Sequence, residues 1–334
     1  MPIQLSGGVI MTGGVNLTPG GSGPTPGGAY SFQGSNFGYS SGGDEHPTSG
    51  DRTSDIIQKF SFASDQNGTD VGDLASAVDK NSGQSSSTSG YSSGGGVVNS
   101  GTAYNVIQKF AFSTDGNASD IADLLSTVSD SCGQSSSVSG YASGGNYTPD
   151  FSNVIQKFPF ASDGNATDVG NLTNEKNRSV GQSSADNGYA SAGYSGGNTV
   201  WDTIDKFPFA SDTDATDVGD LTEAAYDTGS GQSSTTHGYA TGGIVIGLPG
   251  HQSKIDKFSF SSDGNATNIG DLTVTQSIGS GQSSTTSGYA SGGNINDSTN
   301  QTNTIEKFPF ASDADGTDVA DLFAGVFNST GQQY

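Results

Sequence analysis

The sequence has few of the residues that proteins use to build an apolar core or a reactive site. Of its 334 residues only 30% are hydrophobic, and it contains one cysteine, one tryptophan and three histidines. A single cysteine, Cys132, excludes an intrachain disulfide and a zinc site made of cysteines. No run of 18 apolar residues occurs, which excludes a transmembrane helix and argues against membrane insertion.

Positive charge is scarce as well. Lysine and arginine together number 11 against 34 acidic residues, and the formal net charge is −23. Nucleic acids and anionic membranes attract basic patches, so this balance argues against either as a partner. The first residues, Met1 to Leu5, lack the positive start and apolar core of a secretory signal, and we therefore predict no signal peptide.

What the sequence does have is glycine, with 52 copies, and a repeat. Such a polar composition favours disorder unless the few apolar residues recur at fixed places. A Lys-Phe-x-Phe segment recurs six times at spacings of 50, 48, 49, 51 and 50 residues. Its lysines are Lys59, Lys109, Lys157, Lys206, Lys257 and Lys307. Gly-Gln-Ser-Ser, Gly-Tyr-x-x-Gly-Gly and Asp/Asn-Leu segments recur in the same register, so the chain is built from six copies of one unit.

Each unit reads as β-structure. Phe207 and Phe209 stand two residues apart, so both rings lie on one face of a strand. Gly219 interrupts the alternation of the next strand and predicts a β-bulge. Four short strands per unit cannot bury both faces of a sheet alone, whereas radial stacking of six sheets buries them. The sequence therefore predicts an all-β, six-bladed β-propeller with about 50 residues and four strands per blade.

The ends of the chain fall at different phases of the repeat. Residues 331–334, Gly-Gln-Gln-Tyr, open a further copy of the Gly-Gln strand, and we expect them to pair beside the strand of Tyr39 and close the ring. The propeller then spans residues 31–334. Residues 1–30 are rich in glycine and proline and lie outside the repeat. We predict that they form an arm that anchors the propeller to a partner, the alternative being a disordered tail.

Residues 204–243 carry the clearest copy of the unit: Ile-Asp-Lys-Phe-Pro-Phe-Ala-Ser-Asp, then Asp-Val-Gly-Asp-Leu-Thr, Gly-Gln-Ser-Ser and Gly-Tyr-Ala-Thr-Gly-Gly. The Gly-Gly pair, the variable loop after it and the aromatic strand resemble the kelch repeat. The whole unit is similar to repeats of predicted virion structural proteins from marine tailed phages. This resemblance implies a fibre, knob or decoration protein located in the virion. Its partners would be other virion proteins, reached through residues 1–30, and a host surface receptor or glycan.

Strand order divides the loops between two faces. The loops between the second and third strands and between blades differ from copy to copy, whereas the Ser-Asp turns and the turns before Gly-Tyr are nearly constant. We predict that the variable face contacts partners. The candidate contact residues are His46, Tyr147, Trp201 and His251. Neutral drift in idle loops is the alternative explanation.

The constant turns suggest a second candidate site. Asp65, Asn67, Thr69 and Asp73 stand at positions 1, 3, 5 and 9 of a loop, as in calcium-binding loops of some other propellers, and the spacing recurs from Asp263. Calcium requires six or more oxygen ligands, and position 5 supplies only a hydroxyl. The alternative is an Asx turn that closes a hairpin. We therefore predict no cofactor, with calcium at these four residues as the minor alternative.

No enzyme signature is present. Three scattered histidines and a misplaced cysteine do not supply a copper-oxidase site, and two arginines, Arg52 and Arg178, are too few for a sialidase site. A residue present in all six units is also a poor candidate for a single active site. We expect a non-enzymatic protein-interaction or host-adsorption module. The alternative is a free carbohydrate-binding propeller lectin.

Overall fold

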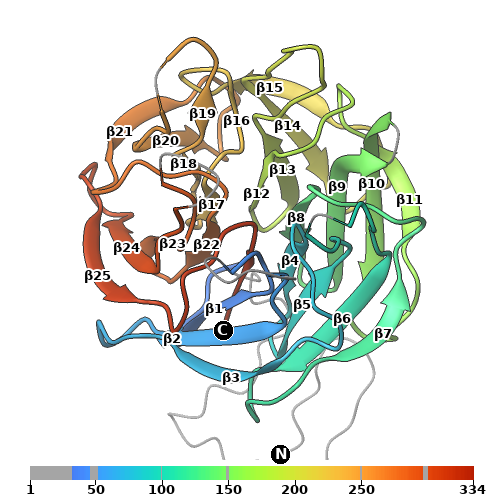
Figure 1. Ribbon diagram of the computed structural model, residues 1–334. Coiled ribbons are helices and arrows are strands. Elements are labelled where there is room, and N and C mark those ends of the chain that lie inside the picture. Colours follow the sequence, from blue (N-terminus) through green and yellow to red (C-terminus); the bar gives the residue numbers. More distant parts are fainter. Residues whose placement is uncertain (1–31, 46–51, 99, 148–149, 249, 296–299) are drawn as a thin grey trace, which may run out of the picture.

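A computed structural model describes residues 32–45, 52–98, 100–147, 150–248, 250–295 and 300–334. These residues form six antiparallel sheets of four strands each, arranged around a common axis (Figure 1). The predicted six-bladed β-propeller is thereby confirmed. Within the described ranges there is no helix of the length and apolar character needed to cross a membrane.

Each blade runs outward from the axis in four strands. Blade 1 consists of β26 (Thr330–Gln333), β1 (Phe37–Ser41), β2 (Ile56–Ser61) and β3 (Thr69–Asp73). Blade 2 consists of β4 (Ser82–Ser85), β5 (Ser89–Ser93), β6 (Val106–Ala111) and β7 (Ser119–Asp123). Blade 3 consists of β8 (Cys132–Ser135), β9 (Ser139–Tyr147), β10 (Asp150–Pro159) and β11 (Thr167–Asn171).

Blades 4 to 6 repeat the plan. Blade 4 consists of β12 (Val180–Ser183), β13 (Asn187–Ser191), β14 (Thr203–Pro208) and β15 (Thr216–Asp220). Blade 5 consists of β17 (Ser230–Ser233), β18 (His237–Thr241), β20 (Lys254–Ser259) and β21 (Thr267–Asp271). Blade 6 consists of β22 (Ser280–Ser283), β23 (Ser287–Ser291), β24 (Thr304–Pro309) and β25 (Thr317–Asp321). A small extra sheet pairs β16 (Ala225–Tyr226) with β19 (Ile244–Val245).

Ring closure occurs as the sequence predicts. The C-terminal strand β26 pairs antiparallel with β1, with Gln332 opposite Tyr39, and so completes blade 1 from both ends of the chain. The predicted bulge is also present, because the pairing of β14 with β15 shifts register opposite Gly219, between Thr203 and Asp205. The strands end slightly earlier than their motifs: β2 stops before the second phenylalanine, Phe62, and β3 before Leu74.

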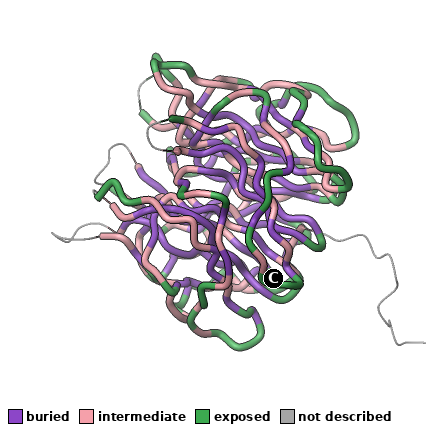
Figure 2. The backbone as a smooth tube through the Cα atoms, turned by 90° about the vertical axis from the view of Figure 1, so that its right-hand side faces the viewer, coloured by how far each residue is buried: buried purple, intermediate pink, exposed green. Residues whose placement is uncertain are grey.

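The hydrophobic core is divided among the six interfaces between blades. In each, the tyrosine of one blade stacks on the second phenylalanine of the next, as Tyr91 does on Phe160, with ring centroids 4.7 to 5.0 Å apart. Aromatic pairs at this distance add to the stability that burial alone provides. In the side view the buried backbone lies inside the body and the exposed segments are at the loops (Figure 2). Because the few apolar residues recur in every repeat, this polar chain has six small hydrophobic cores, one between each pair of neighbouring blades.

Polar contacts between blades follow the same repeat. The glutamine of each inner strand, such as Gln84, donates through Nε2 to the main-chain oxygen of the tyrosine in the next blade, at 2.9 to 3.0 Å. These six glutamines are almost fully buried. A buried amide without such a partner would destabilise the fold, so the repeat of Gly-Gln reflects the need to join neighbouring blades.

Candidate partner-binding face

The antiparallel strand order assigns the loops to two faces. Inner strands start on the face that also holds the loops between second and third strands, and the remaining turns lie on the opposite face. We call the first the variable face and the second the uniform face. For example, the loop of residues 42–55 differs in length and sequence from that of residues 94–105, whereas the turns on the uniform face are nearly identical. The variable face is thus built from six different loop sets on one rigid frame.

On the uniform face, three of the four calcium candidates contact a neighbouring blade. The Asp65 carboxylate pairs with Lys307 Nζ at 3.2 Å, and Asn67 Oδ1 accepts a hydrogen bond from the main-chain N–H of Asp321. The Thr69 hydroxyl donates to the main-chain oxygen of Lys59. Asp73 donates its main-chain N–H to Asn117 of the following blade.

The equivalent turns of the other blades make the same contacts. Each repeat lysine pairs with the first aspartate of the next blade's turn, at 2.7 to 3.2 Å. The third turn residue accepts an N–H from the preceding blade, at 2.9 to 3.2 Å. Among the described residues no group of three or more His, Cys, Asp or Glu side chains is placed to hold a metal ion. The observed geometry gives the turns a role in joining blades.

The predicted contact residues that the structure describes lie on the variable face but do not form one site. His46 falls outside the described residues. Tyr147 ends β9, and its hydroxyl accepts a hydrogen bond from Gln156 Nε2 at 2.7 Å while its ring packs against the core. Tyr147 therefore also has a structural contact in blade 3.

Trp201 and His251 belong to the next two blades. The indole N–H of Trp201 donates to Ser195 Oγ at 2.5 Å, and the ring is half-buried. His251 Nδ1 lies 2.7 Å from the main-chain oxygen of Asn294, which links the loops of blades 5 and 6. The two residues fix loop shape, and each is only partly covered by the chain.

An aromatic cluster that our sequence reasoning missed lies beside Trp201. Tyr194 makes ring contacts with Phe151 at 5.9 Å and with Tyr226 at 5.8 Å, and the Arg178 guanidinium lies 5.9 Å from its ring centroid. These residues come from blades 3, 4 and 5. They occupy positions that vary between copies of the repeat: Tyr194 stands where the other units have Asp44, Gly96, Asn146, Ile244 and Asn294. That variation was the available signal.

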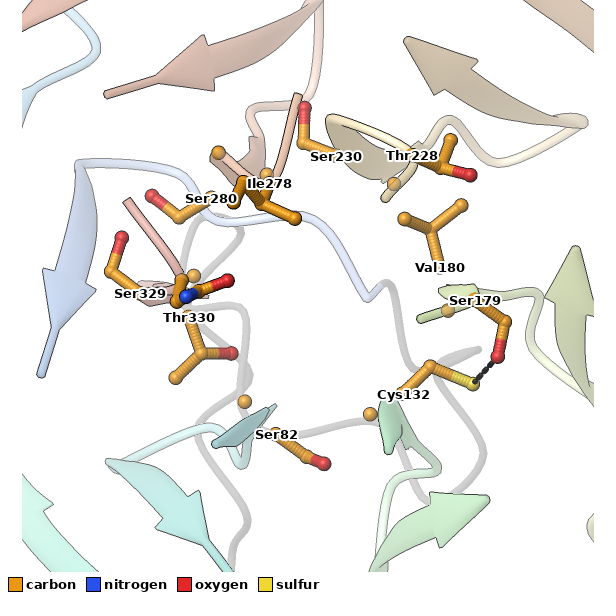
Figure 3. A pocket seen from close by; sticks show the side chains of 18 of the residues that line it. Ser82, Cys132, Ser179, Val180, Thr228, Ser230, Ile278, Ser280, Ser329 and Thr330 are labelled. Atoms are coloured by element: carbon orange, nitrogen blue, oxygen red, sulfur yellow. Dashed lines mark hydrogen bonds between the residues drawn. The ribbon is translucent and has the colours of Figure 1, made fainter. Parts of the chain in front are cut away.

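The axis of the propeller holds a narrow channel. Small side chains of the inner strands line a cavity of about 130 Å³ (Figure 3). Cys132 is one of them; its sulfur accepts a hydrogen bond from Ser179 Oγ, and burial raises the pKa of its thiol. A protonated, buried thiol is a poor nucleophile.

At the variable face, the channel opens between six residues with left-handed backbone, φ 48 to 57°. They are Lys80, Asp130, Arg178, Asp227, Ile278 and Asn328. Main-chain hydrogen bonds link most of them to the equivalent residue of the preceding blade, for example Asp130 N–H to the Lys80 oxygen at 2.9 Å. Arg178 and Asp227 form an ion pair at 3.2 Å. The ring fixes six different side chains around one opening.

Comparison with protein-family models and with curated proteins finds no match to this chain.

Proposed function

We propose that this chain is a non-enzymatic structural protein of a phage virion, a fibre, knob or decoration component. Its propeller serves as a protein-interaction or host-adsorption module. The fold is consistent with an interaction module, and the phage assignment rests on the repeat resemblance. The observation that carries the proposal is the asymmetry between the faces: six unlike loop sets on one side and six like turns on the other. Unlike loops suit an asymmetric partner, because each presents different side chains.

The path of the chain indicates which face of the propeller is directed towards the anchor and which towards a receptor. Gly34 N–H donates to the main-chain oxygen of Ser283 at 2.8 Å, at the uniform-face end of an inner strand. Gln333 Nε2 donates to the main-chain oxygen of Phe32, which lines the channel. The described chain therefore begins, at Phe32, on the side away from the variable loops. An anchor on that side leaves the variable face directed outward, towards a receptor.

A mass-spectrometric inventory of purified particles tests the virion role. We expect the chain in fixed proportion to other particle proteins, and a variant without residues 1–30 to be missing from particles while folding normally. Full-length chain absent from purified particles, but abundant in infected cells, would contradict the proposal.

A free carbohydrate-binding lectin is the second candidate. The aromatic cluster of Phe151, Tyr194 and Tyr226 favours it, because aromatic rings offer large, rigid contact surfaces with little entropy loss. Binding of the purified chain to a glycan array, without co-purification with particles, would favour the lectin.

A further inference from the structure

A pocket of about 700 Å³ opens on the variable face beside the channel, between blades 1, 2 and 3. We call it the blade-2 pocket. Its charged lining residues are Asp44, Arg52, Asp79 and Lys80, and Val97 and Phe327 contribute apolar surface. Pockets that bind small organic groups have this size and this mixture of apolar walls with a few polar groups.

Asp79 is the unusual member of this lining. Its residue is only 4% exposed, and within the described part of the chain its carboxylate has no ion pair and no hydrogen bond other than that from its own main-chain N–H. The pKa of Asp79 is raised to about 6, mainly by burial. The nearby carboxylates of Asp130 and Asp44 also raise it, whereas the ammonium group of Lys80 lowers it. A buried carboxylate without a partner destabilises a fold. It therefore needs a reason to be there.

The fold itself does not need a carboxylate at this position. The main chain of Asp79 exchanges two hydrogen bonds with Gly96, both 2.9 Å long. Ser129, Asn177, Ser277 and Phe327 exchange the same main-chain bonds in their own blades with other side chains. Since the backbone performs the structural role, the side chain of Asp79 is available for binding.

The wall of the pocket opposite Asp79 also differs from that of the other blades in the sequence. Gly96 occupies the position after the Gly-Gly pair, where every other blade carries a side chain. A Cβ at Gly96 would lie 2.5 Å from the main-chain oxygen of Thr102, so glycine allows Thr102 to pack closely against this position. This occurs in the one blade whose opposite residue is acidic, and Gly96 and Thr102 both line the pocket.

The charged residues around the pocket determine the charge of the group that it can bind. Asp44 pairs with Arg52 at 3.1 Å, and Arg178 pairs with Asp227 across the channel mouth. With these pairs set aside, the described charged groups around Asp79 are its own carboxylate, that of Asp130 and the ammonium group of Lys80, an excess of one negative charge among them.

We propose that the blade-2 pocket binds a primary ammonium group, such as a lysine side chain of a partner protein, with Asp79 as its counter-ion. One such group neutralises the excess charge, and its methylene stem lies against Val97 and Phe327. The proposal rests on the proposed role of the variable face and specifies the chemistry of its partner.

Binding of two matched probes to the full-length chain tests this site. Nα-acetyl-lysine methylamide carries the ammonium group, and Nα-acetyl-norleucine methylamide has a similar stem without it. Titration followed by NMR is expected to show saturable binding of the lysine probe only. Asp79→Asn should weaken that binding at least tenfold, whereas Asp150→Asn, an exposed carboxylate in the β9–β10 hairpin, should leave it unchanged.

The pH dependence supplies a second measurement. The charged groups around Asp79 are Asp44, Asp130, Lys80 and Arg52. Because the pKa of Asp79 is about 6, lowering the pH from 7.5 to 5 protonates it, and affinity for the lysine probe should fall about tenfold. The Asp79→Asn variant should lack this fall.

Three results would overturn the proposal: equal binding of the two probes, equal affinity of the wild type and Asp79→Asn, or no saturable binding of the lysine probe at millimolar concentration. A methyl glycoside that binds in an Asp79-dependent way when the lysine probe does not would make the pocket a sugar site instead. Failure of the particle and receptor experiments with intact probe binding would reject the proposed function and leave this site standing.

Discussion

At the residue scale, glycine determines how closely the blades approach the axis. A Cβ added to Gly181 would lie 2.0 Å from the main-chain oxygen of Gly133, and the equivalent glycines of the other inner strands are as crowded. Both groups belong to strands held in register on each side, so neither can move away. Glycine is required here by space, since these residues do not have positive φ.

Gly181→Ala should therefore destabilise the protein by about 3 kcal/mol, the upper range for overpacking of a core. Gly164→Ala is the matched control, because its added Cβ meets no atom closer than 3.6 Å. It should change the free energy of unfolding by less than about 0.5 kcal/mol. Urea denaturation of both variants measures the difference; equal stabilities would refute the crowded inner ring.

The buried carboxylate of Asp79 predicts a pH-dependent stability. A carboxyl whose folded-state pKa is raised binds its proton more tightly in the folded state, so its stability contribution is full in acid and is lost as the pH rises through about 6. Asp79→Asn should remove this loss. We expect the variant to match the wild type near pH 4 and to exceed it by about 2 kcal/mol at pH 7.5. Denaturation curves at the two pH values decide; a less stable variant at pH 7.5 would contradict the burial of an unpaired charge.

At the scale of the element, one pair of positions shows how the blades diverge without losing their shape. A valine stands four residues before the inner strand in three blades, and the third strand of the same blade carries a buried glutamine. The pairs are Val326 and Gln58 in blade 1, Val78 and Gln108 in blade 2, and Val128 and Gln156 in blade 3. Blade 4 has Lys176 and Asp205 instead, a fully buried ion pair at 3.1 Å. Both positions thus differ together: the valine and the glutamine of blades 1 to 3 are a lysine and an aspartate in blade 4.

Lys176→Val alone should destabilise the protein by about 3 to 5 kcal/mol, because it leaves the carboxylate of Asp205 buried without its ammonium partner. The double variant Lys176→Val/Asp205→Gln recreates the arrangement of blades 1 to 3. It should recover stability to within about 1 kcal/mol of the wild type. Thermal and urea unfolding of the three proteins measure this coupling; additive effects would show that the two positions are independent.

The sequence was sufficient to predict the elements because their signals repeat. Phe207 and Phe209 indicated a strand, Gly219 a bulge, and the final Gly-Gln the closing strand. The contact of Tyr194 with Arg178 and the pocket beside Asp79 could not be predicted, since both depend on how unlike loops from neighbouring blades meet. The repeated motifs are sufficient to predict the strands and their order. A site made of residues that differ between copies can be found only once the three-dimensional arrangement of the loops is known.

At the scale of the whole molecule, the two chain ends make a single closed ring. Lys307 and Asp65 form the last of the six lysine–aspartate pairs of the repeat, and Gln332 joins the C-terminal strand to Tyr91 of blade 2. Each blade therefore has two neighbours, and no interface is left open.

Removal of β26, residues 330–334, should open the ring and expose the edge of β1. Loss of several kcal/mol is expected, which corresponds to a fall in melting temperature of roughly 10 °C or more for a chain of this size. Removal of residues 1–30 is the control and should leave the melting temperature unchanged. Calorimetry of both truncated chains tests closure; equal melting temperatures would contradict it.

The central claim is that the variable face makes the partner contact, and binding of the labelled chain to host cells tests it most directly. Two variants should be compared with the wild type: Tyr194→Ala/Trp201→Ala/Tyr226→Ala on the variable face, and Val138→Ser/Thr235→Ser/Asp186→Ser on the uniform face. We predict that the first loses binding while keeping its β-sheet circular dichroism, and that the second binds like the wild type. Binding that survives the first variant and is abolished by the second would contradict the account.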